Sequence, residues 1–331
     1  MKLKIYMATI VVLLIIAIIL YNKKEKYITK TVLISDTILN IKAQTTERNM
    51  EKLINAITNE INRIDFIINP YNTESEISIL NKKSLEGETQ IKVSKELASI
   101  ISTGLKYSKL ADGYDISIRP LIELWGFGVK TNQTVPSKEE IDNALLNINY
   151  TKAMLYTNDN DDIYINLSSP LAFDFGASGK GYIIDKIKNI FNKFDIKNYL
   201  IDYGGDTYAN GVNQKGNPWV IAIRNPRNDE DGFLGLIQST NTTIVTSGDY
   251  ERFFIENNTN YHHIINSITG YPSTNAISAT IVHTNAEDAD SLSTIAFLLG
   301  TNFFNNTNFI YKEAYIVDEN GELFIQTNDS F

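Results

Sequence analysis

The sequence predicts an α+β protein in which mainly antiparallel sheets pack against several helices, preceded by one N-terminal transmembrane helix. Three observations indicate this architecture. An uncharged apolar run occupies residues 5–20, and the segments 47–68 and 94–110 have the apolar spacing of amphipathic helices. Beyond residue 150, short β-branched runs alternate with turns, which is typical of antiparallel strands.

The apolar run at 5–20 is dominated by Ile, Leu and Val and is followed by Lys23-Lys24-Glu25-Lys26. It is slightly shorter than the roughly 20 residues that cross a bilayer, and Tyr6 and Tyr21 extend it toward the interfaces. A cleaved signal peptide and a soluble core helix are the alternatives. Because no small-x-small pair follows the run, we favour an uncleaved anchor. Lysines flank both ends, so charge alone leaves its orientation open.

The composition of the 331 residues indicates a folded body, because 43% are hydrophobic and 21% are charged. No linker divides it, so we expect a membrane anchor with its basic flank at 1–30 and one domain at 31–331. The absence of cysteine excludes disulfides, thiolate metal sites and a cysteine nucleophile. Beyond residue 30 the chain has 24 basic and 38 acidic residues, a net charge of −14, so no nucleic-acid partner is expected.

Local patterns predict the elements of the domain in order. A strand is expected at 32–43, and a helix follows at 47–68. Ser94 and Ser137 are expected N-caps of helices at 94–110 and 137–146, the second with a capping box completed by Glu140. The Asn-rich patches 257–260 and 305–308 are expected to be turns. Further helices are expected at 180–194 and 288–299, and further strands at 154–156, 163–167, 199–202, 219–223, 243–246, 279–283 and 314–317.

A Gly-rich turn, Asp174-Phe-Gly-Ala-Ser-Gly-Lys-Gly, leads into the helix expected at 180–194. Free backbone N–H groups at such a helix start, together with Lys180, attract an anion such as a diphosphate. The spacing differs from that of a P-loop. On the residues alone the alternative stays open, in which the glycines serve a tight turn and Lys180 is solvated.

Three other groups of polar residues bear on chemistry. Asp290 and Thr294 lie four apart on one helix face, where they can converge on a hard cation such as Mg²⁺; helix capping and back-bonding are the alternative. His262 and His263 point to opposite sides of an expected strand, so only one can face a site, and a structural role is the alternative. Ser247 lacks the signature of an activated nucleophile.

Taken together and in this order, the segments resemble the ApbE family of FAD:protein FMN transferases, also called flavin transferases. The resemblance covers roughly residues 32–320. The segments that carry it are Pro70–Asn81, Gly113–Ile116, Pro120–Gly128, Asp174–Asp185, Gly204–Asp206, Thr246–Arg252, His263–Gly270 and Ala289–Thr294.

The resemblance implies an ApbE-like fold and an enzyme that binds FAD with Mg²⁺. Its FMN half would pass to a Thr or Ser hydroxyl of an acceptor protein, with release of AMP. The implied metal ligands are the Ala177 carbonyl, the Asp290 carboxylate and the Thr294 hydroxyl. Lys180 would add positive charge at the phosphates, and His263 is the candidate general base. The implied flavin contacts are Tyr71, Trp125, Gly126, Phe127, Asp174, Lys180 and Ile264.

Two departures from the family pattern affect the expected site. Ser35-Asp36-Thr37 stands where the family has Met-Gly-Thr, and Ile265-Asn266-Ser267 stands where it has Ile-Asp-Pro. Loss of the carboxylate at Asn266 favours an alternative, a homologue that binds FAD or hydrolyses it to FMN and AMP without transfer. A third hypothesis is an anchored binding module for another ligand.

The family usually works outside the cytoplasmic membrane. We therefore expect the catalytic domain on the extracytoplasmic side of the cell membrane, held by its N-terminal anchor. The acceptor would then be a neighbouring protein such as a subunit of a membrane redox complex.

Overall fold

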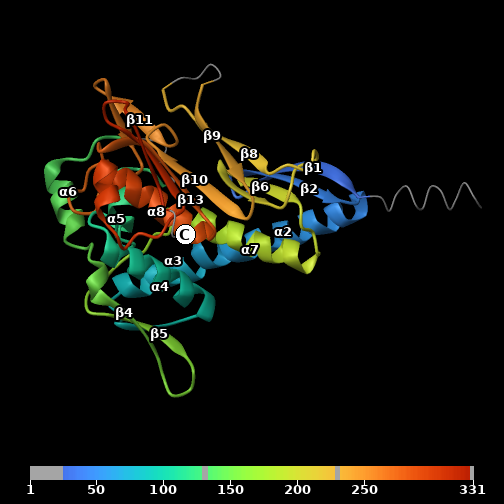
Figure 1. Ribbon diagram of the computed structural model, residues 1–331. Helices are drawn as coiled ribbons and strands as arrows, with labels where there is room; N and C mark the ends of the chain where they lie inside the picture. The colour runs from blue at the N-terminus through green and yellow to red at the C-terminus, as the bar shows by residue number, and fades with distance from the viewer. Residues whose placement is uncertain (1–24, 129–132, 228–231, 329–331) are drawn as a thin grey trace, which may run out of the picture.

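The computed structural model describes residues 25–128, 133–227 and 232–328 (Figure 1). The predicted membrane-spanning run at 5–20 lies outside these residues. Within the described ranges, no helix combines the length and the apolar character that crossing a membrane requires.

The largest sheet, counted over the described part of the chain, has eight strands in the order β1-β2-β6-β7-β10-β13-β14-β15, and each neighbouring pair is antiparallel. Its strands are β1 (Lys26–Ile34), β2 (Thr37–Thr45), β6 (Tyr199–Tyr203), β7 (Asp206–Asn210), β10 (Thr242–Gly248), β13 (Ala276–His283), β14 (Glu313–Asp318) and β15 (Leu323–Thr327).

Smaller antiparallel sheets extend from this body. They comprise β3 (Gln90–Val93), β5 (Ile163–Leu167) and β4 (Ala153–Thr157) in that order, the pair β8 (Trp219–Arg224) and β9 (Phe233–Ser239), and the pair β11 (Phe253–Glu256) and β12 (Thr259–His262). The predicted α+β class with mainly antiparallel sheets is confirmed.

The helices begin largely where the sequence places N-caps. Ser94 Oγ accepts from Leu97 N at 3.1 Å, and both hydrogen bonds of the capping box join Ser137 and Glu140. The described helices are α2 (Glu47–Ile68), α3 (Glu76–Leu85), α4 (Lys95–Leu110), α5 (Arg119–Leu124), α6 (Lys138–Leu145), α7 (Gly179–Lys193) and α8 (Ala286–Leu299), with short 3₁₀ turns η1 (Tyr150–Lys152) and η2 (Gly300–Asn305).

The core forms where helices cover the large sheet. Helix α8 packs on β10 and β13, α7 packs on α8, and α2 packs on α7, so three helices far apart in sequence lie side by side (Figure 1). Helix α8 is buried on almost every face, since Leu292, Ile295 and Phe297 have no exposed surface. A helix that is buried on nearly every face belongs in the middle of such a layer.

The single strand predicted at 32–43 is wrong, because this segment is the β1–β2 hairpin. Ser35 and Asp36 form its two-residue turn with φ of 49° and 54°, the left-handed values that a tight right-twisted hairpin requires. The predicted turn at 257–260 is correct only in its first half. Asn257 and Asn258 turn with positive φ, whereas the next two residues already belong to β12.

Candidate functional site

The N-terminal end of α7 lies directly against α8 because Gly181 has no side chain. A Cβ at Gly181 would come within 2.1 Å of the Ala286 carbonyl oxygen and 2.8 Å of Asp290 Cβ. This close approach lets the Gly181 N–H donate to Asp290 Oδ2 at 2.9 Å. The predicted Gly-rich turn and the predicted Asp290 are therefore parts of one site.

Lys180 and Asp206 form an ion pair beside this contact, in which the lysine side chain is 35% exposed and the carboxylate is buried. Lys180 Nζ lies 2.7 Å from Asp206 Oδ2, and the Asp206 side chain is 1% exposed. Burial alone would lower the pKa of Lys180, but the carboxylates of Asp206 and Asp290 outweigh it and the net shift of that pKa is upward. Burial, opposed by Lys180, raises the pKa of both carboxyl groups. Two buried carboxylates thus share one lysine and leave excess negative charge.

The residues implied as metal ligands are all oxygen donors on adjoining elements. Asp290 and Thr294 lie on one face of α8, and Thr294 Oγ1 is 3.4 Å from Ser247 Oγ on β10. The Gly181 N–H, which in a regular helix would reach the Ala177 carbonyl, donates to Asp290 instead. Across the described residues no hydrogen bond to the Ala177 carbonyl is found.

This donor set fits a hard divalent cation that keeps several water or substrate ligands. It contains a single acid, in agreement with the absence, over the described ranges, of any cluster of three or more His, Cys, Asp or Glu side chains arranged around a metal position. The excess negative charge at Asp206 and Asp290, and the buried Asp206 Oδ1 with no hydrogen-bond partner among the described residues, favour the same kind of ion.

Tyr71 and Asp174, two of the implied flavin contacts, are joined by an arginine that the sequence did not single out. The Arg119 guanidinium lies over the Tyr71 ring at 4.5 Å from its centroid, and its Nη1 is 3.1 Å from Asp174 Oδ2. The other Asp174 oxygen accepts from Gly176 N at 2.8 Å. Burial is the main cause of a raised pKa of Tyr71. The surroundings of Arg119 at the start of α5 are therefore charged and aromatic.

The run Trp125-Gly126-Phe127 lies at the end of α5. Trp125 has no exposed surface, and its indole N–H donates to the Gly270 carbonyl at 2.8 Å. Its ring supports the loop from within the core. Gly126 has a φ of 76°, which only glycine adopts readily. Phe127 is 6% exposed and meets the His263 ring edge-on. Contact of this run with a flavin stays a prediction.

His262 and His263 point to different surroundings, as the sequence predicts for neighbours at a strand end. Buried His262 Nε2 donates to the Ser273 carbonyl at 2.8 Å, which is a structural role. His263 Nδ1 lies 3.3 Å from the Arg252 carbonyl, so Nδ1 carries the proton and Nε2 keeps its lone pair. Burial, then the charges of Arg252 and His262, lower the pKa of His263 to about 3. His263 is thus neutral at pH 7.

Ile264, the remaining implied contact, is 5% exposed and packs in the main core. Its carbonyl accepts from Ser273 N at 2.9 Å. The neighbouring departure at Asn266 keeps a well-defined turn, because its side-chain Oδ1 accepts from the N–H groups of Ile268 and Thr269. An amide oxygen here makes the hydrogen bonds that a carboxylate would make.

Ser35-Asp36-Thr37, the first departure from the family pattern, lies at the β1–β2 turn close to Lys180. A Cβ on Gly204 would meet Thr37 Cγ2 at 2.8 Å and lie 3.7 Å from Lys180 Cδ. The hairpin tip that carries Ser35 and Asp36 is therefore next to the site, and the altered residues stand at its rim.

Two functional positions were found only in the structure. Arg119 is a lone charge in the apolar run 116–122, and a buried charge in such a run needs a partner, which is the signal that was available. In the sequence, Asp206 stands out only as the end of Gly204–Asp206, one of the segments that carry the family resemblance. Its pairing with Lys180 depends on the neighbouring strands and could not be read from spacing.

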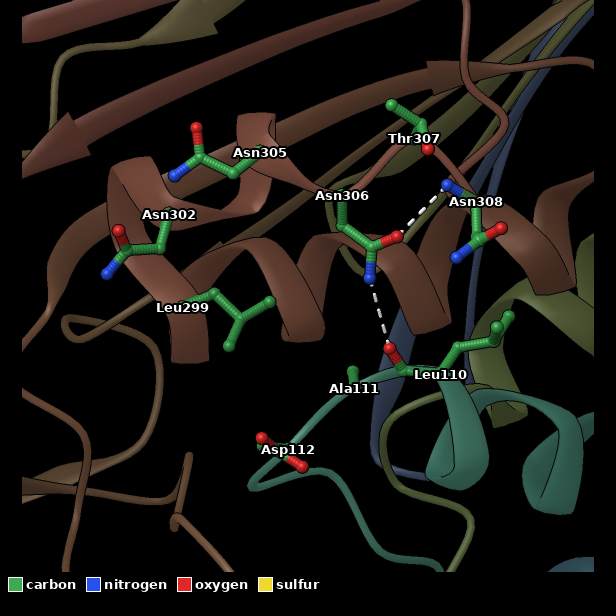
Figure 2. Close-up of a pocket in the computed structure, with 9 residues that line it drawn as sticks. All are labelled: Leu110, Ala111, Asp112, Leu299, Asn302, Asn305, Asn306, Thr307 and Asn308. Carbon is green, nitrogen blue, oxygen red and sulfur yellow. Dashed lines mark hydrogen bonds between the residues drawn. The ribbon is translucent and has the colours of Figure 1, made fainter.

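A surface cavity of about 490 Å³ lies apart from these residues, between the end of α4 and the turn after η2 (Figure 2). Asn306 bridges its walls, since Nδ2 donates to the Leu110 carbonyl at 3.2 Å and Oδ1 accepts from Asn308 N at 3.0 Å. Residues that line it include several asparagines but none of the predicted site residues.

The fold and this site define an α+β protein of the kind seen in solved ApbE structures. The crystal structure of the ApbE protein from Thermotoga maritima matches with a TM-score of 0.81 and 29% identity, covering 92% of this chain and 98% of that one. The flavinyl transferase ApbE from Pseudomonas stutzeri matches with a TM-score of 0.78, covers 93% of this chain and 96% of its own, and at 22% identity supports the fold alone.

The chain belongs to the ApbE family, whose model matches residues 35–307. A relative from Haemophilus influenzae is 29% identical over 260 residues, which cover 77% of this chain and 74% of the relative. One from Escherichia coli K12 is 28% identical over 255 residues, covering 74% and 70%. Both are named FAD:protein FMN transferase. The resemblance inferred from the motifs is confirmed.

Proposed function

We propose that this protein is an FAD:protein FMN transferase that uses Mg²⁺, modifies a Thr or Ser hydroxyl of an acceptor protein and releases AMP. The observation that carries the proposal is the cluster at the start of α7, where Lys180 pairs with buried Asp206 and the Gly181 N–H binds Asp290. A lysine at a helix start beside an oxygen-only donor set suits a diphosphate held with a hard cation, because the cation would offset the excess negative charge of the two carboxylates. The names of the relatives supply the reaction.

The bond changes in the reaction are simple. The acceptor oxygen forms a bond to the FMN-side phosphorus, the bond from that phosphorus to the oxygen of AMP breaks, and the acceptor proton leaves. Mg²⁺, when held by Ala177, Asp290 and Thr294, supplies Lewis-acid charge at the phosphate oxygens. Lys180 adds a fixed positive charge that Asp206 holds in place, and this charge stabilises the developing negative charge.

His263 is the candidate acceptor of the hydroxyl proton. Its Nδ1–H is held by the Arg252 carbonyl, which leaves the Nε2 lone pair to receive a proton. Because the pKa of His263 is lowered to about 3, the imidazole is always in the accepting form but is a weak base. We therefore assign it a contribution smaller than that of the charged cluster.

The test is an assay of covalent flavin transfer. The full-length chain, purified in detergent, is incubated with FAD, Mg²⁺ and an acceptor protein that carries an Asp-Gly-x-x-Thr-Ala-Thr sequence, and flavin fluorescence of the acceptor is read after denaturing electrophoresis. We expect fluorescence on the acceptor and AMP in solution. Lys180→Met should abolish labelling. Lys188→Met is the matched control, because Lys188 is also an ion-paired lysine of α7 but pairs with Asp185.

A second candidate function is hydrolysis of FAD to FMN and AMP without transfer, which the Asn266 departure favours. The same assay separates the two, because free FMN with no labelled acceptor would replace our proposal by hydrolysis. The turn that Asn266 still forms favours transfer.

We further propose that residues 31–331, together with the start of β1 (Lys26–Ile34), act as one transferase domain, held on the extracytoplasmic face of the cell membrane by an anchor in the residues before β1. The apolar run at 5–20 supports an anchor. An alkaline phosphatase fusion at the C-terminus should be active in a bacterial host. An inactive phosphatase fusion, together with an active C-terminal fusion to a reporter that works only in the cytoplasm, would refute this orientation.

A further inference from the structure

Arg119 is a buried cation with contacts in three directions. Its residue is 7% exposed although it lies on the short helix α5. The guanidinium stacks over Tyr71, pairs with Asp174 at 3.1 Å and reaches Glu123 at 2.8 Å. Glu123 is largely exposed, whereas the Asp174 side chain is 11% exposed. The interaction with Asp174 is therefore the one that is shielded from water.

The partners of Arg119 come from separate parts of the chain. Tyr71 lies in the loop between α2 and α3, and Asp174 lies in the loop before α7. The only long-range tie of the Asp174 backbone found among the described residues runs from its N–H to the Ile116 carbonyl at 2.9 Å. Arg119 thus connects two loops that both border the expected dinucleotide site.

Tyr71 is held in position from a second side. A Cβ on Gly128 would lie 2.6 Å from Tyr71 Cε1, so the ring rests against the Gly128 backbone. One face of the ring is covered by the guanidinium, yet the residue is 38% exposed. Two contacts thus fix the position of the ring while part of it stays exposed, and a flat ligand ring can pack on that exposed part.

We propose that Arg119 is a positioning residue of the FAD site, which holds the Tyr71 ring and the Asp174 carboxylate in the arrangement that receives one ring system of the dinucleotide. The inference rests on the proposed function, because it takes FAD as the ligand. Arginine suits the role, since its planar guanidinium can stack on a ring while its N–H groups bind a carboxylate; lysine can do only the second.

The test measures FAD binding to the full-length chain by flavin fluorescence titration. Arg119→Met keeps the length of the side chain and removes the charge, and we expect the Kd for FAD to rise about tenfold. Arg119→Lys should give an intermediate Kd. In the transfer assay, the KM for FAD should rise while kcat at saturating FAD changes little, because Arg119 contacts Tyr71 and Asp174 and not the Lys180–Asp206 pair.

A double-mutant cycle distinguishes positioning from a general effect on folding. If Arg119 acts through the ring, Arg119→Met should raise the Kd much less in a Tyr71→Leu background than in the wild type. Gly128→Ala, which displaces Tyr71 and leaves Arg119 intact, should also raise the Kd. Arg63→Met is the matched control, because Arg63 is an ion-paired arginine whose partners are Glu60 and Glu96 instead of Tyr71 and Asp174, and its loss should leave the Kd unchanged.

The outcomes separate this inference from the function on which it rests. An unchanged Kd in Arg119→Met, or equal effects of that change with and without Tyr71, overturns the positioning role while the proposed function stands. A wild-type chain that binds no FAD overturns both. Circular dichroism melting of each variant shows that the protein measured is folded.

Discussion

Asp290→Asn is the change that most directly tests the charge balance of the site. The substitution keeps the size of the side chain and an oxygen that can accept from the Gly181 N–H, but it removes one of two buried carboxylates that share Lys180. Without a divalent ion, this removal relieves repulsion with Asp206, so we expect the variant to melt at the wild-type temperature or above it. With Mg²⁺ the order should reverse, because only the wild type keeps the carboxylate that we propose as a ligand of the ion.

The size of the reversal follows from linkage. A ligand at a hundredfold excess over its Kd stabilises the folded state by about 2.7 kcal/mol. For 331 residues the unfolding entropy is about 0.7 kcal/mol per kelvin, so the wild-type Tm should rise by about 4 °C. Differential scanning calorimetry, first in chelator and then in excess Mg²⁺, measures the Tm without and with the ion. The variant should rise by less than about 1 °C.

A matched control is Asp115→Asn. Asp115 is also a buried carboxyl, but it accepts from the Ser117 and Tyr150 N–H groups away from α7. This variant should be less stable and should keep the full Mg²⁺ response. An Asp290→Asn chain that gains as much from Mg²⁺ as the wild type would refute the assignment of the ion to this cluster.

Three further changes probe separate parts of the site and its supports. His263→Gln should lower the transfer rate by about a hundredfold. Because the pKa of His263 is lowered to about 3, titration of His263 should cause no step in the wild-type rate between about pH 5 and pH 8. A step near pH 6.5 would contradict the lowered pKa. Gly181→Ala should cost about 1–3 kcal/mol in urea unfolding, since its Cβ would meet the Ala286 carbonyl, and an unchanged free energy of unfolding would disprove the packing argument. Burial, then the neighbouring acids Asp288 and Asp185, raise the pKa of Glu287 from 4.5 to about 8, so its contribution to stability is present below pH 4.5 and lost as pH rises through 8. Glu287→Gln should therefore be more stable than the wild type at about pH 9 and similar to it at about pH 4. Equal Tm differences at the two pH values would contradict this pKa shift.

The sequence predicts the long elements well and the short polar ones poorly, for physical reasons. Met50, Leu53 and Ile57 repeat at helical spacing, so α2 was predicted with its observed ends. Helix α3 was missed because two of its buried positions are polar. Asn81 is buried to bind both the N–H and the carbonyl of Phe173, a long-range pairing that no local period reveals.

The β1–β2 hairpin was missed for a related reason. A turn of Ser35 and Asp36 lacks the glycine that usually marks left-handed backbone, so the apolar alternation on either side looked like one strand. The site residues also divide into those that a local pattern predicts and those that only the fold brings together. Asp290 and Thr294 were expected on one helix because they lie four residues apart, and both lie on α8, whereas Arg119 and Asp206 find their partners only through the folded chain.

The Gly-rich turn has features that support each of its two competing interpretations, the anion site and the tight turn. Lys180 is not simply solvated, because it pairs with buried Asp206, and this favours the anion-site interpretation. Gly181 nevertheless serves packing, because any side chain there would collide with the Ala286 carbonyl. The packing is what brings Asp290 to the start of α7, so the glycine acts on the chemistry through the distance between two helices. A sequence with alanine at 181 would keep the lysine, the acid and the helix start, and we expect it to lose the site.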